Sequence, residues 1–303
     1  MDYTLAVDIG GTKIAAGIFD STGSRTARFT APSDVSSEEN MYTSLLSGID
    51  QTLHLAGLDK ADIKRMGVAM PGQVDTANGV AVYQNNLPWR NYPLGDRLRG
   101  EFPDALLAFE HDVAAAAIGE HSVRADGGTL FVYITISTGI AATILYEGKP
   151  IRGGGLAGEV GLFPVEGGTL ETYASGSAME RHAAAAFNIP SLAGAASEWK
   201  RGNPELHSFF QSRAYQLALA AFQMTCTLDP NILVFGGGVI NHSPEFFQLI
   251  QDEYAALCTH PLQKNWPGRL ECSLLKEDSG LAGAAIKARN QTAVKGLAGF
   301  HPE

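Results

Sequence analysis

The sequence has few cysteines, fewer basic than acidic residues, and no long apolar run. Its three cysteines, Cys226, Cys258 and Cys272, lack a short paired spacing, so we expect reduced core cysteines and neither a disulfide framework nor a zinc site. A net charge of −10 argues against a nucleic-acid partner, because proteins that bind DNA or RNA present basic surfaces. No apolar run reaches membrane length and no signal peptide precedes the first strand, so we expect a cytoplasmic protein without a membrane partner.

The length and composition indicate a globular protein of two domains. A chain of 303 residues exceeds what one hydrophobic core usually supports. Hydrophobic residues make up 45% of the chain and charged residues 18%, which is ordinary for a folded protein.

The first stretch of interest consists of two apolar runs, residues 5–9 and 14–19, on either side of a Gly-Gly-Thr-Lys turn. This pattern predicts a β-hairpin with glycines at positive φ. The backbone N–H groups of such a turn can bind a phosphate. Asp8 ends the first run, where a carboxylate suits a hydrated Mg²⁺ better than a core. An ordinary tight hairpin beside an aspartate is the alternative.

Further elements of an α/β half follow. Ser36 and Glu39 have the spacing of a capping box ahead of a predicted helix at residues 42–58. A buried strand at residues 66–70 ends at Pro71-Gly72, and residues 73–89 form a long polar loop, of a length that is usually functional or disordered. Trp89 at its end argues against disorder.

Asp112 follows a predicted strand at residues 106–109 and precedes an alanine-rich helix. Proteins of the α/β class bind ligands at such strand ends, and the helix dipole stabilises a carboxylate there. The alternative for Asp112 is a simple N-cap.

The second half of the chain repeats the opening pattern. A strand at residues 129–136, the turn Ser137-Thr138-Gly139 and a returning run at residues 140–145 suggest a duplicated fold with a cleft between its halves. A glycine-rich loop at residues 153–161 contains Glu159, and Glu171 follows. A long helix over 204–228, a strand over 231–235 ending in three glycines, and a helix from Gly280 complete the chain.

Taken in order, these motifs resemble the ROK family (repressor, open reading frame, kinase) of bacterial sugar kinases, within the actin–hexokinase superfamily. The resemblance extends over nearly the whole chain. The matching segments are residues 8–13, 71–72, 86–89, 112–120, 137–140, 158–161, Glu171, 229–230 and 236–238.

The resemblance implies an α/β fold of the two-domain actin-like or ribonuclease H-like class. One domain is expected at residues 1–115 plus 286–303 and the other at 116–285. The implied activity is ATP- and Mg²⁺-dependent phosphorylation of a hexose or N-acetylated hexosamine at the C6 hydroxyl, by a homodimer.

The resemblance also implies the roles of particular residues. Asp112 would be the general base, and Asp8 would hold Mg²⁺ through water. The sugar would contact Gly72, Asn86, His111, Asp112, Glu159 and Glu171. ATP would contact Gly10, Gly11, Thr12, Lys13, Thr138, Gly139, Gly236, Gly237 and Gly238.

The sequence also departs from the family pattern. Leu162 stands where many members have a histidine, and residues 163–172 contain no cysteine, so we expect no structural zinc. His111 replaces an asparagine, which could reposition a hydrogen bond to the sugar or simply be a polar residue of the cleft. Ser137, Ala141 and Ala142 replace glycines and require negative φ.

Two other functions and several substrates stay open. A sugar-responsive repressor would carry a DNA-binding segment ahead of Asp8, where only seven residues precede it. A catalytically silent sugar-binding protein is suggested by Leu162 and His111, but it would not need Asp112. Glucose, mannose, fructose, N-acetylmannosamine and a β-glucoside are all compatible, and Leu162 would suit an acetamido group or an aglycone near C1 or C2.

Overall fold

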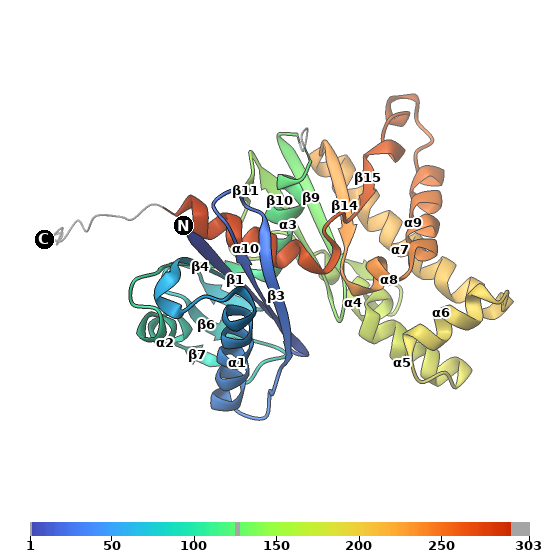
Figure 1. Ribbon diagram of the computed structural model, residues 1–303. Helices are drawn as coiled ribbons and strands as arrows, with labels where there is room; N and C mark the ends of the chain where they lie inside the picture. Colours follow the sequence, from blue (N-terminus) through green and yellow to red (C-terminus); the bar gives the residue numbers. More distant parts are fainter. Residues whose placement is uncertain (1, 125–127, 292–303) are drawn as a thin grey trace, which may run out of the picture. The chain divides into compact units, whose positions relative to one another are not determined.

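The computed structural model describes residues 2–124 and 128–291 (Figure 1). These residues form two compact units. Unit 1 contains the described residues up to Gly119 together with those from Gly280 onward, and unit 2 contains those from Glu120 to Ser279. Because unit 1 is made of two chain segments, the last described helix completes the unit that the first strand begins.

The sheet of unit 1 has five strands in the order β3-β2-β1-β4-β8. The strands β1 and β2 form the predicted antiparallel hairpin, with Ile9 opposite Ile14, and β4 and β8 run parallel to β1. The strand β3 was not predicted from its polar sequence, because it is an edge strand with mostly exposed or half-buried residues. The bounds are β1 Tyr3–Ile9, β2 Lys13–Phe19, β3 Arg25–Pro32, β4 Ile63–Met70 and β8 Leu106–His111.

The first helix begins earlier than predicted and has a different cap. Its N-cap is Ser37, whose side chain accepts a hydrogen bond from the Asn40 N–H at 3.1 Å. Glu39 binds Arg97 through its carboxylate instead, so the prediction of a Ser36–Glu39 capping box is wrong. The helices of this part are α1 Glu38–Ala56, η1 Lys60–Asp62, α2 Leu94–Glu101, α3 Asp112–Ser122 and α10 Ser279–Asn290.

The predicted polar loop after Gly72 contributes two strands to a small antiparallel sheet, which a third strand just after the loop completes. Its strands are β5 Gln73–Asp75, β6 Val80–Tyr83 and β7 Arg90–Tyr92, in that order. Trp89 is fully buried and stacks on Tyr92 with 4.9 Å between the ring centroids. The inference from Trp89 that this stretch is ordered is confirmed, but the interpretation as one long loop is wrong.

The helix α10 packs against unit 1 through small residues. A Cβ on Gly67 of β4 would lie 1.9 Å from the Ala284 carbonyl oxygen, and one on Gly283 would lie 1.7 Å from that of Ala115. Leu281, Ala284 and Ala285 share a buried cluster with Ala6, Ala15, Phe19, Ala69 and Ala115. Glycine is therefore required at residues 67 and 283 by the close approach of backbones.

The sheet of unit 2 repeats the topology of the first, in the order β11-β10-β9-β14-β15. The strands β9 and β10 form an antiparallel hairpin, β11 continues it, and β14 and β15 run parallel to β9. The predicted duplication of the α/β half is confirmed. The bounds are β9 Leu130–Ile136, β10 Ile140–Tyr146, β11 Lys149–Pro150, β14 Ile232–Gly236 and β15 Leu270–Cys272.

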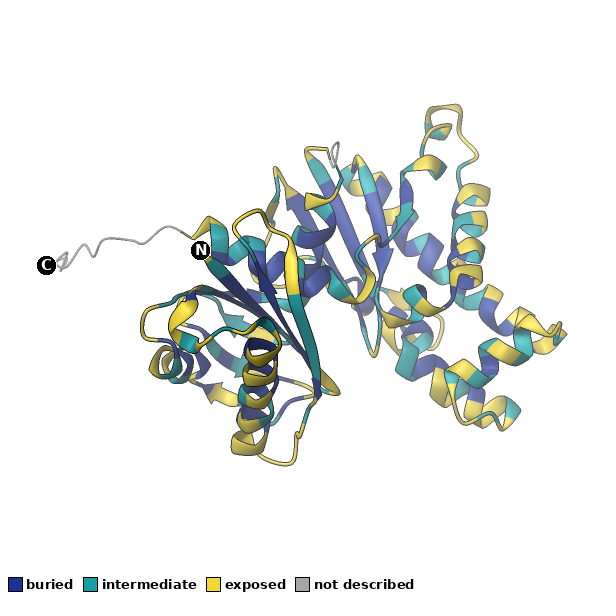
Figure 2. Cartoon of the chain, viewed as in Figure 1, coloured by how far each residue is buried: buried dark blue, intermediate teal, exposed yellow. Residues whose placement is uncertain are grey.

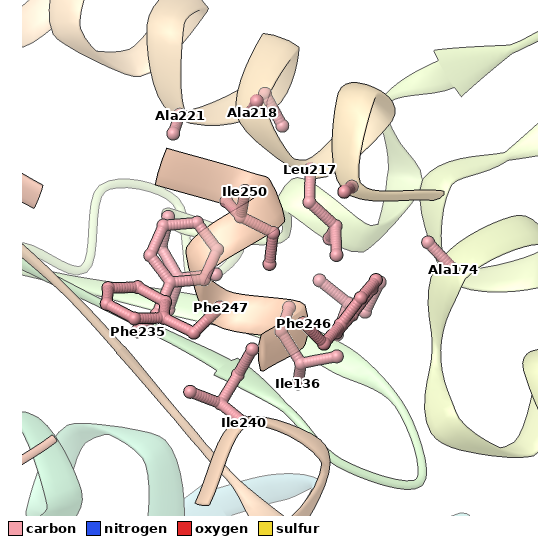
Figure 3. Packing of buried hydrophobic residues seen from close by; sticks show 14 of the residues in the cluster. Ile136, Ala174, Leu217, Ala218, Ala221, Phe235, Ile240, Phe246, Phe247 and Ile250 are labelled. Carbon is pink, nitrogen blue, oxygen red and sulfur yellow. The ribbon is translucent and has the colours of Figure 1, made fainter. Parts of the chain in front are cut away.

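The core of unit 2 lies between this sheet and two long helices, α7 and α9. The helix α7, Pro204–Leu228, has the predicted bounds and begins with a proline at its first residue behind the Asn203 cap. Figure 3 shows Leu217 of α7, Ile250 of α9 and Phe235 of β14 in this core. The helix α9 spans Pro244–Leu257, and strands are mostly buried in both sheets, whereas the outer sides of the helices are exposed (Figure 2).

Shorter elements connect these parts of unit 2. They are η2 Val160–Leu162, β12 Pro164–Val165, β13 Gly168–Thr169, α4 Leu170–Ala174, α5 Gly176–Phe187, α6 Leu192–Lys200, α8 Gly238–His242, η3 Pro261–Gln263, η4 Pro267–Arg269 and η5 Lys276–Asp278.

The three cysteines are free. Cys226 is exposed, so the expectation of a core cysteine is wrong there, whereas Cys258 and Cys272 are half-buried and pack against the hydrophobic core of unit 2. Within residues 2–124 and 128–291, no helix combines the length and the apolar character needed to cross a membrane.

Candidate active site

The candidate residues of unit 1 follow the carboxyl ends of three parallel strands. Asp8 of β1 pairs in register with Ala69 of β4, and Ala69 pairs with Glu110 of β8. The turn at residues 10–13, the Pro71-Gly72 corner and Asp112 therefore leave the sheet at one edge. Such an edge is where α/β proteins bind ligands.

The turn between β1 and β2 is fixed by a hydrogen bond within the turn and by one from Ser33, outside the hairpin. The Gly10 N–H donates to the Lys13 carbonyl at 3.0 Å, and the Ser33 hydroxyl donates to the Gly10 carbonyl at 2.6 Å. Thr12 and Lys13 are exposed. Ser33 was not predicted, because it follows the unpredicted strand β3.

Glycines are needed in this turn for space and not for their φ angles. Neither Gly10 nor Gly11 has a positive φ, so the prediction on this point is wrong. A Cβ on Gly11 would lie 2.9 Å from both the Cβ and the carbonyl oxygen of Asn86. The structure thus brings Asn86, a predicted sugar contact, against the predicted phosphate turn.

Gly72 does require the left-handed region, with φ of +72°. A Cβ at this residue would lie 2.4 Å from the Tyr83 carbonyl oxygen and 3.0 Å from Gln84 Oε1. The corner after β4 therefore packs directly on the segment that leads to Asn86.

Asp112 begins α3 and keeps an accessible carboxylate. Its Oδ1 accepts a hydrogen bond from the Val113 N–H at 2.7 Å and lies 3.4 Å from His111 Nε2. The side chains of Asp112 and His111 are 33% and 29% exposed, so both are open to a ligand. The carboxylate therefore bonds to the N–H of the adjacent residue, whereas an N-cap would accept from an N–H two or three residues on, and it is accessible for proton transfer.

Asp8 has little compensation for its charge. Burial raises the pKa of Asp8 to about 7, the negative charge of Asp112 adds to this shift, and Lys13 and Arg28 oppose it. A Cβ on Gly280, at the start of α10, would lie 2.3 Å from Asp8 Oδ2. The absence of a side chain at Gly280 is what leaves room for this carboxylate.

The Asp8 site suits a hydrated divalent cation. Hard cations such as Mg²⁺ prefer carboxylate oxygens and usually keep several waters beside one or two protein ligands. No group of three or more histidine, cysteine, aspartate or glutamate side chains within the described residues has a metal-binding arrangement. Asp8 fits a site in which the protein supplies few ligands and a bound phosphate would supply others.

An ion pair behind the strand end, in which only the carboxylate is fully buried, was missed by sequence reasoning. Glu110 is fully buried, and its Oε1 accepts a hydrogen bond from the His111 N–H at 2.9 Å. Its Oε2 pairs with Lys287 Nζ of α10 at 3.0 Å. Because β8 is an edge strand, this pair holds the backbone that carries His111 and Asp112. The two residues lie 177 apart in sequence, so no local signal reveals the pair.

In unit 2, the turn between β9 and β10 is hydrogen-bonded to Glu171, which is predicted to contact the sugar. Glu171 Oε2 accepts a hydrogen bond from the Ile140 N–H at 2.8 Å, and a Cβ on Gly139 would lie 2.5 Å from the same oxygen. The Gly176 N–H donates to the Ser137 carbonyl at 2.7 Å. The required negative φ at Ser137, Ala141 and Ala142 is confirmed.

The glycine-rich segment at residues 153–161 contacts Glu171 at one residue and exposes its own glutamate, Glu159. A Cβ on Gly161 would lie 3.4 Å from Glu171 Oε2, so this segment packs against Glu171. Glu159 is exposed and lines a cavity of about 280 Å³ together with Leu156, Phe163 and Met224. Leu162 is 63% exposed, which is high for a large apolar side chain. No hydrogen bond joins Glu159 to Glu171 within the described residues.

The three glycines at the end of β14, Gly236, Gly237 and Gly238, are needed for different reasons. A Cβ on Gly236 would lie 2.3 Å from the Tyr133 hydroxyl, and one on Gly237 would lie 2.5 Å from the Ile136 carbonyl oxygen. Gly237 alone of the three has a positive φ, of +87°. Gly238 faces open space, which leaves backbone accessible to a flat ligand.

The chain is similar to known proteins over nearly its whole length. The model of the ROK family matches residues 4–291. A glucokinase of Halalkalibacterium halodurans is 25% identical and covers 95% of this chain and 96% of its own length. An N-acetylmannosamine kinase of Escherichia coli O157:H7 is 29% identical over 95% of this chain and 99% of its own.

A solved structure has the same fold. The ROK family glucokinase of Streptomyces griseus, in complex with glucose and AMPPNP, superposes with a TM-score of 0.81 at 25% identity, over 95% of this chain and all of that one. With the family model matched over almost the entire length, the chain belongs to the ROK family and has its two-domain actin-like fold.

Proposed function

We propose that this protein is a sugar kinase that transfers the γ-phosphoryl group of ATP to a hexose or N-acetylated hexosamine at the C6 hydroxyl. The observation that carries the proposal is the accessible Asp112 carboxylate at a strand end, beside the poorly compensated Asp8. The glucokinase and N-acetylmannosamine kinase relatives support the sugar kinase class.

Asp112 would act as the general base. Its carboxylate would accept the proton of the sugar hydroxyl as that oxygen bonds to the γ-phosphorus and the bond to the β-phosphate oxygen breaks. Phosphoryl transfer depends mainly on positioning and on neutralising charge, so this base needs no raised pKa. His111, 3.4 Å from Asp112, would help to orient the hydroxyl.

Asp8 would hold Mg²⁺ through water, and the ion would neutralise charge on the phosphates. The turn residues Gly10 to Lys13, with Thr138 and Gly139, would bind the phosphates through backbone N–H groups and side chains. Gly236, Gly237 and Gly238 would contact the adenosine.

The sugar would be bound by polar side chains and one close backbone approach. The residues that would contact it are Gly72, Asn86, Glu159 and Glu171. We propose that the two compact units are the two domains expected from the sequence. A homodimer remains part of the proposal by analogy with the family.

The substrate within this class is left to experiment. The relatives are named for both glucose and N-acetylmannosamine. The exposed Leu162 favours an acetamido group over a hydroxyl nearby, because an apolar side chain offers that hydroxyl no hydrogen bond. Equal turnover of glucose and N-acetylmannosamine would remove this argument.

The test is ATP-dependent ADP release across a panel of sugars by the wild type and by Asp112→Asn. Turnover of one sugar by the wild type that is lost in the variant, while sugar binding is kept, is the expected result. Sugar binding without turnover of any sugar by the wild type would favour the second candidate, a catalytically silent sugar-binding protein, for which Leu162 and His111 are the motivation.

A further inference from the structure

A lysine loop lies beside the glycine turn at the carboxyl edge of the second sheet. The strands β14 and β15 are parallel neighbours, with Phe235 opposite Cys272, and the Ser273 N–H donates to the Phe235 carbonyl at 2.8 Å. The turn at residues 236–238 and the segment at residues 273–278 therefore leave adjacent strand ends. The helices α8 and η5, which follow them, pack together.

Within this segment, Lys276 has an unfavourable backbone conformation. Its φ is +54°, in the left-handed region that side chains other than glycine, asparagine and aspartate rarely adopt. Such conformations persist only where the surroundings enforce them, and they are common at functional sites.

A buried carboxylate enforces the conformation of Lys276. Glu120 is fully buried, and its Oε1 accepts hydrogen bonds from the hydroxyls of Ser273 at 2.5 Å and Ser279 at 2.7 Å. Ser273 Oγ in turn accepts from the Lys276 N–H at 2.8 Å, and the single hydroxyl proton of Ser279 is shared between Glu120 Oε1 and the Lys276 carbonyl oxygen, which lies 2.8 Å from Ser279 Oγ. The Lys276 peptide groups are thus held on both sides.

The rest of the Glu120 network fixes the same segment. Its oxygens also accept from the Leu274 N–H at 3.0 Å, the Leu275 N–H at 2.9 Å and Arg124 Nη1 at 2.6 Å. The Arg124 guanidinium is 5% exposed and also binds Glu271. The proposed reaction uses none of these groups.

The Lys276 side chain itself is exposed and free. Its ammonium makes no hydrogen bond or ion pair with any residue within 2–124 and 128–291. A glycine would adopt this φ without strain, so the lysine brings a cation to this edge at a cost in stability.

We propose that Lys276 is a nucleotide-contacting residue, whose ammonium donates hydrogen bonds to acceptor atoms of the base or ribose of the nucleotide bound at the 236–238 turn. The sheet order favours the adenosine end over the phosphates. The predicted phosphate turn joins β9 and β10, on one side of β14, whereas Lys276 follows β15 on the other. This inference rests on the proposed function of the glycine turn.

The test compares Lys276→Gly and Lys276→Ala with the wild type. Both variants should raise KM for ATP by about 3- to 10-fold, a range typical of losing one charge-assisted hydrogen bond near solvent, with kcat and KM for the sugar unchanged. Only the glycine variant should raise Tm, by a few degrees, since it alone relieves the strain. A residue with a merely structural role would not weaken nucleotide binding while Tm rises.

Glu147→Gly is the matched control. Glu147 has a φ of +50° in the β10–β11 turn, so its replacement should raise Tm similarly and leave KM for ATP unchanged. An unchanged KM for ATP in both Lys276 variants would overturn the inference.

Binding measurements separate this inference from the proposed function. In calorimetry, ADP and adenosine should both bind Lys276→Gly more weakly than the wild type, by similar factors. Weakened ADP binding with unaltered adenosine binding would assign Lys276 to the phosphates and overturn the adenosine contact. Failure of the wild type to bind ADP would overturn the proposed function together with this inference, whereas equal ADP binding by both proteins would overturn the inference alone.

Discussion

The two sheets share one topology, but a buried acid beside each has its pKa shifted in the opposite direction. In unit 1, burial and the charge of Asp112 raise the pKa of Asp8 to about 7. In unit 2, Glu120 has no solvent-exposed surface, yet the pKa of Glu120 is lowered. Burial alone would raise it, but hydrogen bonds from Ser273, Arg124 and Ser279 outweigh that effect.

The difference shows that compensation, and not depth, separates the two kinds of acid. A carboxylate surrounded by donors stabilises the charged form and suits a structural role. A carboxylate left beside another one is costly until a cation or substrate arrives, which is typical of functional sites. Four substitutions test this comparison, from the largest expected effect to the smallest.

Asp112→Asn should abolish most of the activity and leave the fold intact. We expect kcat for the preferred sugar to fall by about 10²- to 10⁴-fold, because the general base is lost. Unfolding free energy should change by less than about 0.5 kcal/mol, since the side chain is accessible. Steady-state kinetics and urea denaturation measure the two effects, with the exposed Asp104→Asn as control; loss of stability in step with activity would contradict the assignment.

Glu120→Gln should destabilise the folded protein. The amide leaves several buried donors without an acceptor, so we expect a loss of about 3–5 kcal/mol of unfolding free energy at pH 7. Because the folded pKa of Glu120 is lowered, its contribution is present above the unfolded pKa and is lost as the pH falls through the folded value. The difference between the proteins should therefore shrink in acid.

The matched control for that variant is Glu271→Gln. Glu271 binds the same Arg124 guanidinium at 2.9 Å but is 40% exposed, so its loss should cost at most about 1 kcal/mol. Equal losses in both variants would mean that the buried donors do not determine the stability of the cluster.

Asp8→Asn should stabilise the free protein, but only at higher pH. With a folded pKa of about 7, raised from 3.8, native Asp8 holds its proton where the unfolded chain has lost it, so wild-type stability falls between about pH 4 and pH 7. We expect the variant to gain about 1–3 kcal/mol at pH 8 and nothing at pH 4. Denaturation at both pH values, without nucleotide or Mg²⁺, checks this; a gain that is independent of pH would refute it.

Lys287→Met should give the smallest effect. It removes the partner of Glu110 and loosens the backbone at His111, so we expect kcat to fall about 3- to 10-fold while KM for ATP stays the same. The loss of unfolding free energy should be about 1–3 kcal/mol, because the lysine is 39% exposed but the Glu110 carboxylate that loses it is fully buried. Lys264→Met, at an exposed lysine of unit 2, should leave kcat unaltered.

Much of the fold could be predicted because its signals are local. The apolar spacing in α7 and the strand–turn–strand pattern at each half depend on residues close in sequence. The edge strand β3 was missed because an exposed, polar strand lacks alternation, and the small sheet β5–β7 was missed because its strands have only three or four residues each. Turn composition also could not show that Gly11 is needed for its contact with Asn86 and not for its φ.

In the candidate site, too, residues at strand ends could be predicted from the sequence, whereas their distant partners could not. Asp8 and Asp112 stand directly at strand ends, so their positions follow from the sequence. Their supports do not: Lys287 lies far along the chain from Glu110, and Ser273 and Ser279 lie about as far from Glu120. Such pairs form only when a late segment of the chain folds back onto an early one, and no local sequence pattern encodes that contact.

That return through α10 has a consequence for protein synthesis. The ribosome makes the first sheet early, but Ala6, Ala69 and Ala115 are covered only when residues 280–290 have left the exit tunnel. Unit 2 is one continuous segment and can close while unit 1 still waits for its last helix. We therefore expect a chain that ends at residue 279, held on the ribosome by a linker long enough to place all of it outside the exit tunnel, to resist protease in the second unit and to be cleaved in the first.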